Sequence, residues 1–390
     1  PDWKERGAPL ETEVVDDRFL FLSETGSTQV PNALLPKTLD NHGNYIISLG
    51  QLVRWMGEQA EELEVEVYPG FAAAEVLYND DGGVAGIATR DVGLNKDGSK
   101  KDTFERGCEL RARQTLFAEG CRGSCSEEVM KTFNLREEAG ADPQSYAIGY
   151  KEVWQIDEDK LEPGLVLHSW GWPLQGSSPT DKNYGGAFLY HMKPNLILAG
   201  FVTGLDYENP HLNPYMTFQQ WKHHPEISKH LEGGECISYG ARCLNEGGLY
   251  SIPKLTFPGG ALVGCAAGFL NAMKIKGSHT AIKSGTLCSI VMFENSFVSL
   301  SLSPLSGPYP RSRGSGGLRL AHTVPSWLPF SPCSCKIWQV SWSIEGRELG
   351  VREGVLTLHS LLGDFAPLFS TAISLHAERG TTIFLHDAHE

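Results

Sequence analysis

Apolar and polar residues follow a pattern typical of mixed α/β structure in the first part of the chain. Apolar side chains recur three or four residues apart over residues 49–63, which predicts an amphipathic helix. A short strand is expected at 65–67. Two apolar runs at 72–78 and 84–90 flank a glycine-containing turn, which predicts a β-hairpin. A mostly apolar segment over 108–117 predicts a further strand.

The rest of the first 295 residues continues this alternation. Ser124 and Glu127 have capping-box spacing at the start of a helix that we expect to end at Phe133. Residues 145–250 are richer in Trp, Tyr, Pro and turn residues, and we interpret them as a mostly β region. This order of elements predicts an α/β fold. The remaining expected elements are a strand over 255–263, a glycine-containing loop over 264–277 and a helix over 278–292.

Length and charge narrow the class of protein. The chain has 390 residues, which exceeds the roughly 250–300 residues of a single core and predicts two domains. The net charge of −14 argues against a nucleic-acid partner. No apolar run reaches the ~18 residues of a membrane span, so only a peripheral membrane contact stays open. The nine cysteines are scattered, and we expect mostly reduced thiols.

The composition changes near residues 290–296, where we place a boundary. Residues 296–335 are rich in Ser, Pro and Gly and show no helical or strand period. Acidic and basic residues balance after 295, so the whole negative charge lies before that point. We therefore expect residues 293–390 to form a poorly ordered tail that contributes little to stability.

The first candidate site lies where the strand over 108–117 ends. Ala118, Glu119 and Gly120 follow directly, and a small residue with a glycine lets backbone approach a ligand closely. In open α/β sheets, nucleotides bind at the carboxyl ends of strands. Taken alone, these residues are also compatible with a plain strand-to-helix turn.

The second candidate is the glycine-rich stretch 258–271, which leads from a strand toward a helix expected to begin near Ser278. Free N–H groups at that helix start can face a phosphate or a flavin carbonyl. A packing turn between the strand and the helix is the alternative.

The third candidate is the pair Gly185 and Gly186, which lies between aromatic residues in segment 183–191. Adjacent glycines let a flat ring lie against bare backbone, with an N–H left to donate. The alternative is a Gly-Gly hairpin turn between two strands.

Two groups of potential metal ligands lack the spacing of a known site. The histidines have no carboxylate or thiolate at metal-binding spacing, and we assign them to a solvated face. The cysteine pairs do not match a zinc or iron–sulfur ligand set. The residues concerned are His223, His224 and His230, with the pairs Cys121–Cys125 and Cys333–Cys335.

Several long segments together indicate a protein family much more specifically than any single motif does. The chain closely resembles the electron transfer flavoprotein–ubiquinone oxidoreductases, from Pro1 to about Gly285. The resemblance is carried by NHGNYIISLGQLVRWMGEQAEELEVEVYPGFAAAEVLY, FERGCELRARQTLFAEGCRG, NYGGAFLYH, GLDYENPHLNPYMTFQQWKHHP and SIPKLTFPGGALVGCAAGFLNAMKIKGSHTAIKSG.

This resemblance implies a fold similar to that of the flavin hydroxylases. Residues 41–144 and 251–292 would belong to a discontinuous FAD-binding domain, and residues 1–40 and 145–250 to a β-rich quinone-binding domain. Members of the family hold FAD and a 4Fe–4S cluster. They take electrons from reduced electron transfer flavoprotein and pass them to ubiquinone at the mitochondrial inner membrane, which they contact peripherally.

The resemblance also assigns residues to the two sites. Gly185 and Gly186 match glycines that touch the ubiquinone head group, and Tyr184, Phe19 and Trp170 match positions that line the quinone pocket. Asn271 is a candidate for a hydrogen bond to the flavin. The positions that match FAD-contacting stretches are Ala118, Glu119, Gly120, Gly264, Gly268, Phe269, Leu270, Asn271, His279, Thr280 and Ala281.

Three departures from the family limit what this chain is expected to do alone. The Gly-x-Gly-x-x-Gly segment that seats the FAD pyrophosphate would lie before Pro1. The cysteines that ligate the cluster have no match, and the tail loses its likeness from about Leu287. We therefore expect the chain not to hold FAD stoichiometrically. The alternatives are another FAD-dependent reductase or hydroxylase of the same fold, and a non-catalytic fragment.

Overall fold

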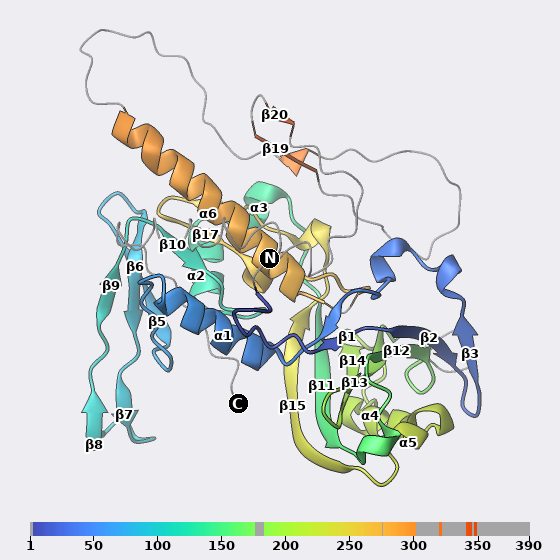
Figure 1. Ribbon diagram of the computed structural model, residues 1–390. Helices are drawn as coiled ribbons and strands as arrows, with labels where there is room; N and C mark the ends of the chain where they lie inside the picture. Colours follow the sequence, from blue (N-terminus) through green and yellow to red (C-terminus); the bar gives the residue numbers. More distant parts are fainter. Residues whose placement is uncertain are drawn as a thin grey trace.

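The computed structural model describes residues 3–175, 183–274 and 276–301, with side chains as far as residue 289 in the last range. Figure 1 shows a large sheet carrying two short helices, beside a second unit built from smaller sheets and the helices α1, α2, α3 and α6. The rest of the predicted tail lies outside the described residues apart from three short strands. These are β18 (Leu320–Ala321), β19 (Ser341–Ile344) and β20 (Arg347–Glu348).

A seven-stranded sheet forms the larger unit, in the order β15-β11-β14-β13-β12-β2-β3. Only the neighbours β12 and β2 run parallel, whereas the other neighbouring pairs of this sheet are antiparallel. The strands are β2 (Asp16–Leu22), β3 (Ser27–Val30), β11 (Tyr146–Gln155), β12 (Leu165–Gly171), β13 (Gly185–Met192), β14 (Leu196–Gly204) and β15 (Glu235–Asn245).

One face of this sheet is covered by α4 (Pro214–Lys222) and α5 (Pro225–Leu231). Each helix begins with proline, which suits a first turn because proline has no N–H to leave unpaired. The Asn213 side chain accepts a hydrogen bond from the Met216 N–H and caps α4. Buried apolar side chains from alternate strand positions pack beneath the two helices and form the larger core.

The second unit surrounds a smaller core. The amphipathic helix α1 (Leu49–Glu61) and the hairpin of β5 (Ala73–Tyr78) and β6 (Val84–Thr89) confirm the predictions from periodicity and turn chemistry. The unit also contains α2 (Ser124–Thr132), α3 (Leu135–Ala139), α6 (Ser278–Ser301), β7 (Val92–Leu94), β8 (Lys100–Glu105) and β9 (Glu109–Arg111). The short elements elsewhere in the chain are the pair β1 (Thr12–Glu13) and β4 (Tyr45–Ile46) and the 3-10 turns η1 (Asn32–Leu34), η2 (Lys37–Leu39), η3 (Glu158–Lys160), η4 (Leu249–Ser251) and η5 (Gly264–Ala267).

A three-stranded sheet at the centre of this unit has the order β10-β17-β16. Its strands are β10 (Thr115–Phe117), β16 (Thr256–Phe257) and β17 (Gly260–Leu262). β10 and β17 are parallel although they lie far apart in the sequence, and Phe117 is paired with Leu262. The two strands therefore end side by side, and the loops that follow them leave the sheet at the same edge.

Four predicted elements differ from the structure. The strand expected over 108–117 is divided into β9 and β10, which join different sheets. Residues 65–67 form no strand, because the Val65 N–H bonds back to the Ala60 carbonyl at the end of α1. The strand expected over 255–263 is divided in two by a turn at Gly259, whose φ is +83°. Helix α6 continues to Ser301 rather than ending at Met292. No proline or glycine lies between Met292 and Pro304, so nothing local ends the helix at Met292.

Two further observations concern the cysteines and the helices in the described part of the chain. The seven cysteines in that part form no disulfide, as predicted. Among the same residues, no helix is both long and apolar enough to cross a bilayer.

Candidate functional site

The ends of β10 and β17 bring the first two candidate segments together. Residues 118–120 follow β10 and residues 264–271 follow β17, and the Val263 N–H donates to the Phe117 carbonyl at 3.1 Å. Both loops therefore leave the same edge of one parallel pair, where α/β folds bind nucleotides. Sequence spacing alone could not establish this proximity, because about 140 residues separate the two segments.

Glu119 is engaged in positioning helix α2. Its carboxylate accepts hydrogen bonds from the Ser126 N–H at 2.6 Å and from the Ser126 hydroxyl at 2.7 Å. The predicted capping box of Ser124 and Glu127 is wrong, because α2 begins after Gly123 without a side-chain cap at that position. A carboxylate near a helix N-terminus is stabilised by the helix dipole, so Glu119 fixes α2 at the edge of the candidate site.

The loop after β17 turns through two left-handed glycines. Gly264 has a φ of +59° and Gly268 a φ of +89°, values that side chains with a Cβ rarely adopt. The Gly264 N–H donates to the Ser284 hydroxyl at 2.9 Å, which ties the loop to α6. The Phe269 N–H bonds back to the Gly264 carbonyl, so Leu270 and Asn271 follow a compact turn.

The start of α6 packs against this turn. The Thr280 hydroxyl donates to the Gly277 carbonyl at 2.8 Å and also to the Phe269 carbonyl. Burial, with Lys274 and Lys276 nearby, lowers the pKa of His279 to about 4. His279 is therefore neutral near pH 7. Together with Ala281, which packs near Gly264, these residues close the loop against the helix.

Gly185 and Gly186 begin strand β13 and do not form a hairpin turn. Gly185 has a φ of 150°, and an added Cβ would overlap the Val202 carbonyl oxygen and the Leu174 side chain. An added Cβ at Gly186 would lie 3.0 Å from the Ser169 carbonyl oxygen, with Trp170 beyond it. Gly185 is thus needed for the backbone itself, whereas Gly186 keeps a small space open beside Trp170.

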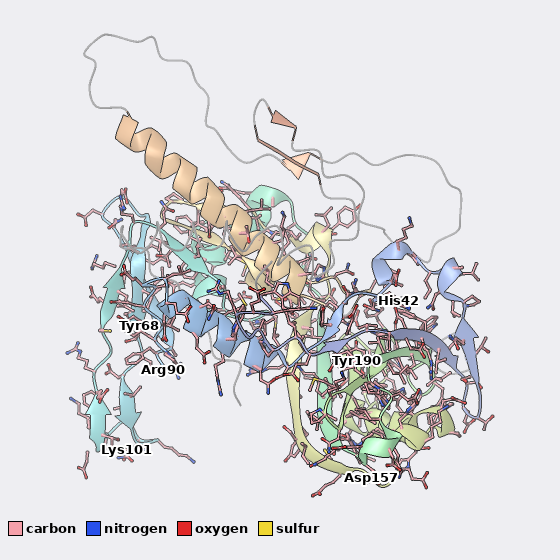
Figure 2. All side chains as sticks on the ribbon, viewed as in Figure 1. His42, Tyr68, Arg90, Lys101, Asp157 and Tyr190 are labelled. Carbon is pink, nitrogen blue, oxygen red and sulfur yellow. The ribbon has the colours of Figure 1, made fainter. Side chains whose placement is uncertain are left out.

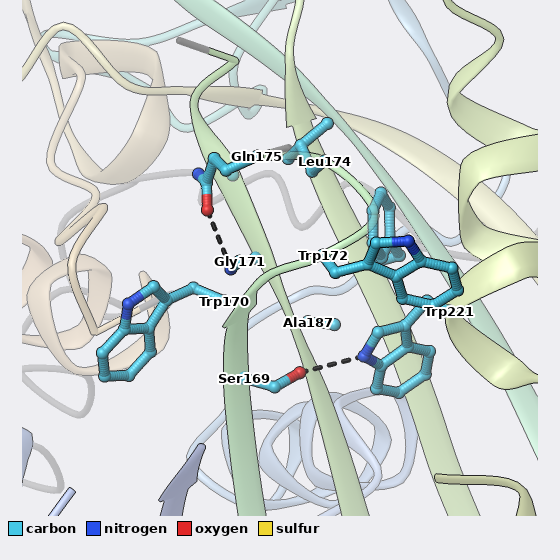
Figure 3. A pocket seen from close by; sticks show the side chains of 11 residues that line it. Ser169, Trp170, Gly171, Trp172, Leu174, Gln175, Ala187 and Trp221 are labelled. Carbon is cyan, nitrogen blue, oxygen red and sulfur yellow. Dashed lines mark hydrogen bonds between the residues drawn. The ribbon is translucent and has the colours of Figure 1, made fainter. Parts of the chain in front are cut away.

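A small cavity lies at these glycines, between β12, β13 and α4 (Figure 3). Figure 3 shows Trp221 bonded to Ser169, and the Trp221 N–H donates to the Ser169 hydroxyl at 2.9 Å. The Gln175 side chain accepts from the Gly171 N–H at 2.8 Å and closes another side. The lining residues are Ser169, Trp170, Gly171, Trp172, Leu174, Gln175, Gly185, Gly186, Ala187, Phe201 and Trp221.

The three aromatic residues predicted near a quinone occupy different positions. Trp170 lines the cavity together with the glycines. Tyr184 precedes β13 and is about half exposed. Phe19 is buried and does not line the cavity, but its ring centroid lies 6.4 Å from that of Trp170. The structure therefore brings Gly185, Gly186 and Trp170 together, with Phe19 behind Trp170.

Sequence reasoning missed a buried polar cluster formed by His168, Tyr190 and Lys276. The Lys276 ammonium donates to the Tyr190 hydroxyl at 2.7 Å, and that hydroxyl lies 2.8 Å from His168 Nε2. The Phe19 ring stacks on the His168 ring with a centroid distance of 4.9 Å. Figure 2 marks Tyr190 within the large sheet. The cluster joins the loop before α6 to the sheet face that carries Phe19.

Burial shifts the acid–base properties of this cluster. It lowers the pKa of Lys276 to about 7, with Lys274 lowering it further and Asp17 opposing the shift. Burial also lowers the pKa of His168 and raises the pKa of the Tyr190 phenol. Lys276 is therefore the member that exchanges a proton near neutral pH.

The assignment of the histidines to a solvated face is wrong for two of the three. His224 and His230 are buried, whereas His223 is exposed. His224 caps α5 by accepting from the Glu226 N–H at 3.2 Å, and His230 lies on the buried side of α5 with His191 at 3.1 Å. Two clusters in the described ranges have atoms close enough to share a cation: Glu162 with His191 and His230, and Asp17 with Asp40 and His42.

Known proteins match most of the described chain. Residues 146–244 match the family described as "ETF-QO, ubiquinone-binding". The mitochondrial electron transfer flavoprotein–ubiquinone oxidoreductase of Rattus norvegicus is 59% identical over 297 residues, which are 75% of this chain and 47% of the relative. The probable enzyme of that name from Acinetobacter baylyi is 54% identical over 295 residues, 75% of this chain and 51% of the relative.

A solved structure shows the fold independently of close sequence similarity. A geranylgeranyl bacteriochlorophyll reductase-like protein from Thermoplasma acidophilum has a TM-score of 0.50 at 14% identity, covering 75% of this chain and 68% of its own. This confirms the predicted α/β fold class, which is that of the flavin-hydroxylase-type proteins. Over the matched segment, the chain is closely similar to the electron transfer flavoprotein–ubiquinone oxidoreductases. It spans about half the length of the curated relatives.

Proposed function

We propose that this chain forms the part of an electron transfer flavoprotein–ubiquinone oxidoreductase in which FAD and ubiquinone meet. Electrons would pass from reduced electron transfer flavoprotein through FAD to ubiquinone. The observation that supports this most strongly is the 59% identity to the rat enzyme over 297 residues, 75% of this chain. The match to a ubiquinone-binding domain over 146–244 coincides with β11 to β15, which include the candidate glycines.

The loops at the ends of β10 and β17 fit a flat cofactor. Gly120 has a φ of +81° and open space where a Cβ would stand, so the backbone there is accessible. Ala118 and the turn over 264–268 are likewise built from small residues, and α6 begins just beyond them. In this proposal these loops hold FAD, which supplies the electron-transfer chemistry. The residues of the chain hold and orient it, and Asn271 remains our candidate for a hydrogen bond to the flavin.

The quinone would lie against the sheet near Gly186. That glycine leaves room beside Trp170, while Phe19 supports Trp170 from behind. A flat head group can contact backbone where no Cβ intervenes. Tyr184, which precedes the two glycines and is half exposed, would border the entrance.

The other parts of the family's chemistry find less support in this chain. Across the ranges that the structure describes, no set of cysteines comes together as an iron–sulfur cluster requires, so the 4Fe–4S cluster does not fit these residues. A peripheral contact with the mitochondrial inner membrane follows from the family assignment alone and belongs to the same proposal.

The test measures how much FAD the protein retains and which electron acceptor it reduces. The purified protein is incubated with FAD, desalted and examined for flavin absorbance, and the reduced flavoprotein is then offered a soluble ubiquinone analogue. We expect quinone reduction to follow flavin content, and we expect the chain alone to hold clearly less than one FAD. NADPH oxidation without quinone reduction would instead favour another reductase of the same fold. Retention of one FAD per chain would refute the expectation of weak binding.

A matched substitution tests the position of the quinone. Gly186→Val places a branched side chain beside Trp170, so we expect quinone reduction to fall at least tenfold while flavin content and reduction by electron transfer flavoprotein stay near normal. Gly240→Val makes the same change on β15, where a Cβ meets nothing within 4 Å, and serves as the matched control. Equal loss of all activities, together with a large fall in melting temperature, would assign Gly186 a purely structural role.

A further inference from the structure

We propose that Asp17, His168, Tyr190 and Lys276 form a proton relay that carries protons from the protein surface to a quinone ring on the sheet face that Gly186 and Tyr190 share. The inference rests on the function proposed above. It assigns a role to four residues, one of which, Lys276, also forms two backbone hydrogen bonds with Asn271 in the candidate FAD loop. Reduction of a quinone to a quinol takes up two electrons and two protons, so a buried quinone needs a path for protons as well as for electrons.

The geometry provides a nearly continuous path. Lys276 Nζ and Tyr190 Oη are 2.7 Å apart, and Tyr190 Oη and His168 Nε2 are 2.8 Å apart. His168 Nδ1 is buried without a hydrogen-bond partner and lies 4.0 Å from Asp17 Oδ1. This gap exceeds a hydrogen bond by about 1 Å, a distance that a small rotation of the imidazole closes.

The outer end of the path reaches solvent. Asp17 is almost fully buried and accepts from the Asn41 N–H at 2.9 Å. Carboxylate and ring atoms of Asp17, Asp40 and His42 lie within 4.8 Å of one another. His42 and Asp40 are both more than half exposed, and their side chains are bonded at 2.8 Å. A proton taken from water by the exposed pair therefore has a short route to the buried carboxyl group.

Each step of the relay is balanced. The protonated Asp17 carboxyl gives its proton to His168 Nδ1, His168 Nε2–H gives its proton to the Tyr190 oxygen, and the Tyr190 O–H gives its proton to the neutral Lys276 amine. The net result is a carboxylate at Asp17 and an ammonium at Lys276, with Tyr190 and His168 unchanged in charge. The ammonium then protonates the quinone oxygen as electrons arrive. The transfer leaves the His168 proton on Nδ1, so the relay returns to its starting state when Asp17 is reprotonated from the surface and the His168 ring and the Tyr190 hydroxyl turn back to their starting hydrogen-bond directions.

The electrostatic surroundings favour this exchange. Burial raises the pKa of Asp17, although its hydrogen bonds with Asn41 oppose the shift, and lowers the pKa of Lys276 to about 7. The two end groups are thereby brought closer together in proton affinity than in water. Other titratable groups that face the path are Lys274, whose pKa burial lowers, and His279, whose pKa burial lowers to about 4.

The alternative interpretation is that these contacts only fasten the loop before α6 to the sheet. Two electron acceptors distinguish a proton relay from this structural role. Quinone reduction needs protons, whereas reduction of ferricyanide takes one electron and no proton. Tyr190→Phe keeps the ring and removes the hydroxyl that bridges His168 and Lys276, which leaves only the longer contact of 3.4 Å between His168 Nε2 and Lys276 Nζ. Tyr239→Phe removes a hydroxyl from an almost fully exposed position on β15 and is the matched control.

For full-length protein purified with its flavin, we expect Tyr190→Phe and Asp17→Asn to lower kcat for a soluble ubiquinone analogue by at least tenfold at pH 7. The KM for the quinone, the flavin content and the rate with ferricyanide should stay within about twofold of the unaltered protein. Equal slowing with both acceptors would show that the contacts are structural, and an unchanged quinone rate would show that protons take another path. Either result overturns the relay.

A second readout does not depend on activity. In protein labelled with carbon-13 at lysine, we expect the Lys276 signal, identified by its loss in Lys276→Met, to titrate near pH 7. It should titrate at lower pH in Asp17→Asn, because the carboxylate at the far end stabilises the ammonium. A Lys276 midpoint above pH 9 would overturn the relay. If the protein reduces ferricyanide but never a quinone, the proposed function fails as well, and the titration still reports on the coupling itself.

Discussion

The two faces of the seven-stranded sheet differ in what they bury. Beneath α4 and α5, the sheet presents Leu22, Leu189 and Phe201, which pack against Phe218 and Trp221 in a mainly apolar layer. Two polar pairs, Glu152 with Lys222 and His191 with His230, also join the sheet to these helices. On the opposite face, the neighbouring positions of the same strands carry Phe19, His168 and Tyr190, with Lys276 bonded to the last two. Because side chains alternate along a strand, the same strands pack mainly apolar side chains against the helices on one side and hold the Lys276 cluster on the other.

Because of this difference, single substitutions should change either the free energy of unfolding or the proton-dependent activity. A change beneath the helices should lower the free energy of unfolding and spare proton-dependent activity. A change on the opposite face should do the reverse. The following four predictions test this separation, beginning with the largest effect.

Phe201→Ala should destabilise the protein most. Phe201 is 2% exposed, and its ring lies 6.0 Å from that of Phe218 and 6.4 Å from that of Trp221. Removing it leaves a cavity that the rigid sheet cannot close, so we expect a loss of about 3–5 kcal/mol in the free energy of unfolding. Urea denaturation followed by tryptophan fluorescence measures this. A loss below 1 kcal/mol would mean that this layer is not the main core.

Gly185→Ala should lower the free energy of unfolding much more than Gly186→Ala, although the two residues are adjacent. An added methyl at Gly185 overlaps the Val202 carbonyl oxygen at an unfavourable φ, so a loss of about 2–4 kcal/mol is expected. At Gly186 the nearest atom lies 3.0 Å away, and about 1 kcal/mol is expected. Thermal and urea unfolding of both variants provide the comparison. Equal losses would contradict the distinction between a backbone glycine and a site glycine.

Lys276→Met should make the protein more stable at pH 6 and leave it nearly unchanged or slightly weaker at pH 10. The folded pKa of about 7 lies below the ordinary value of 10.5, so the unfolded chain binds more protons between these values. Stability of the unaltered protein therefore falls as the pH falls through this window, and the full penalty is present below pH 7. Methionine removes that penalty, which we expect to be on the order of 1–3 kcal/mol.

The measurement is urea unfolding of both proteins at several pH values from 6 to 10. The decisive quantity is the difference between the two free energies of unfolding as the pH changes. A difference that stays constant over the range would show that Lys276 is charged throughout and would remove the acid–base distinction between the two sheet faces.

Phe188→Leu should have the smallest effect. Its ring stacks on Tyr190 at 4.7 Å and covers Gly200, but the residue is only partly buried. Leucine retains most of the apolar volume, so a loss of about 1 kcal/mol is expected. Differential scanning calorimetry against the unaltered protein is sufficient. A loss as large as that of Phe201→Ala would show that both faces are equally important for stability.

Local patterns in the sequence predicted much of this fold. The spacing of apolar residues located α1, and the turn at 79–83 located the hairpin of β5 and β6. The ends of strands also directed attention to residues 118–120 and 264–271, but nothing local shows that β10 and β17 are neighbours. The error at 65–67 arose because a short apolar run cannot reveal that its first N–H is already bonded to a helix carbonyl.

The buried polar cluster lay beyond sequence reasoning for a physical reason. His168 and Tyr190 are 22 residues apart, and Tyr190 and Lys276 are 86 residues apart, so no motif spacing connects them. His230 was misplaced for a related reason. On a helix of seven residues, Ile227 and Leu231 already mark a buried side, and a histidine at the position between them shares it. Burial of polar groups becomes visible only once the packing is known.

The parallel pairing of β2 with β12 has a consequence for the order of events during synthesis. Asp16 is paired with Leu165, and Leu22 with Gly171, so a strand made early finds its neighbour only about 150 residues later. At the usual ~5–20 residues per second, β2 leaves the ribosome roughly 10–30 seconds before β12 can receive it. During that interval the strand containing Phe19, Leu20 and Leu22 pairs only with β3, and its other edge presents unpaired backbone groups that can pair with another chain.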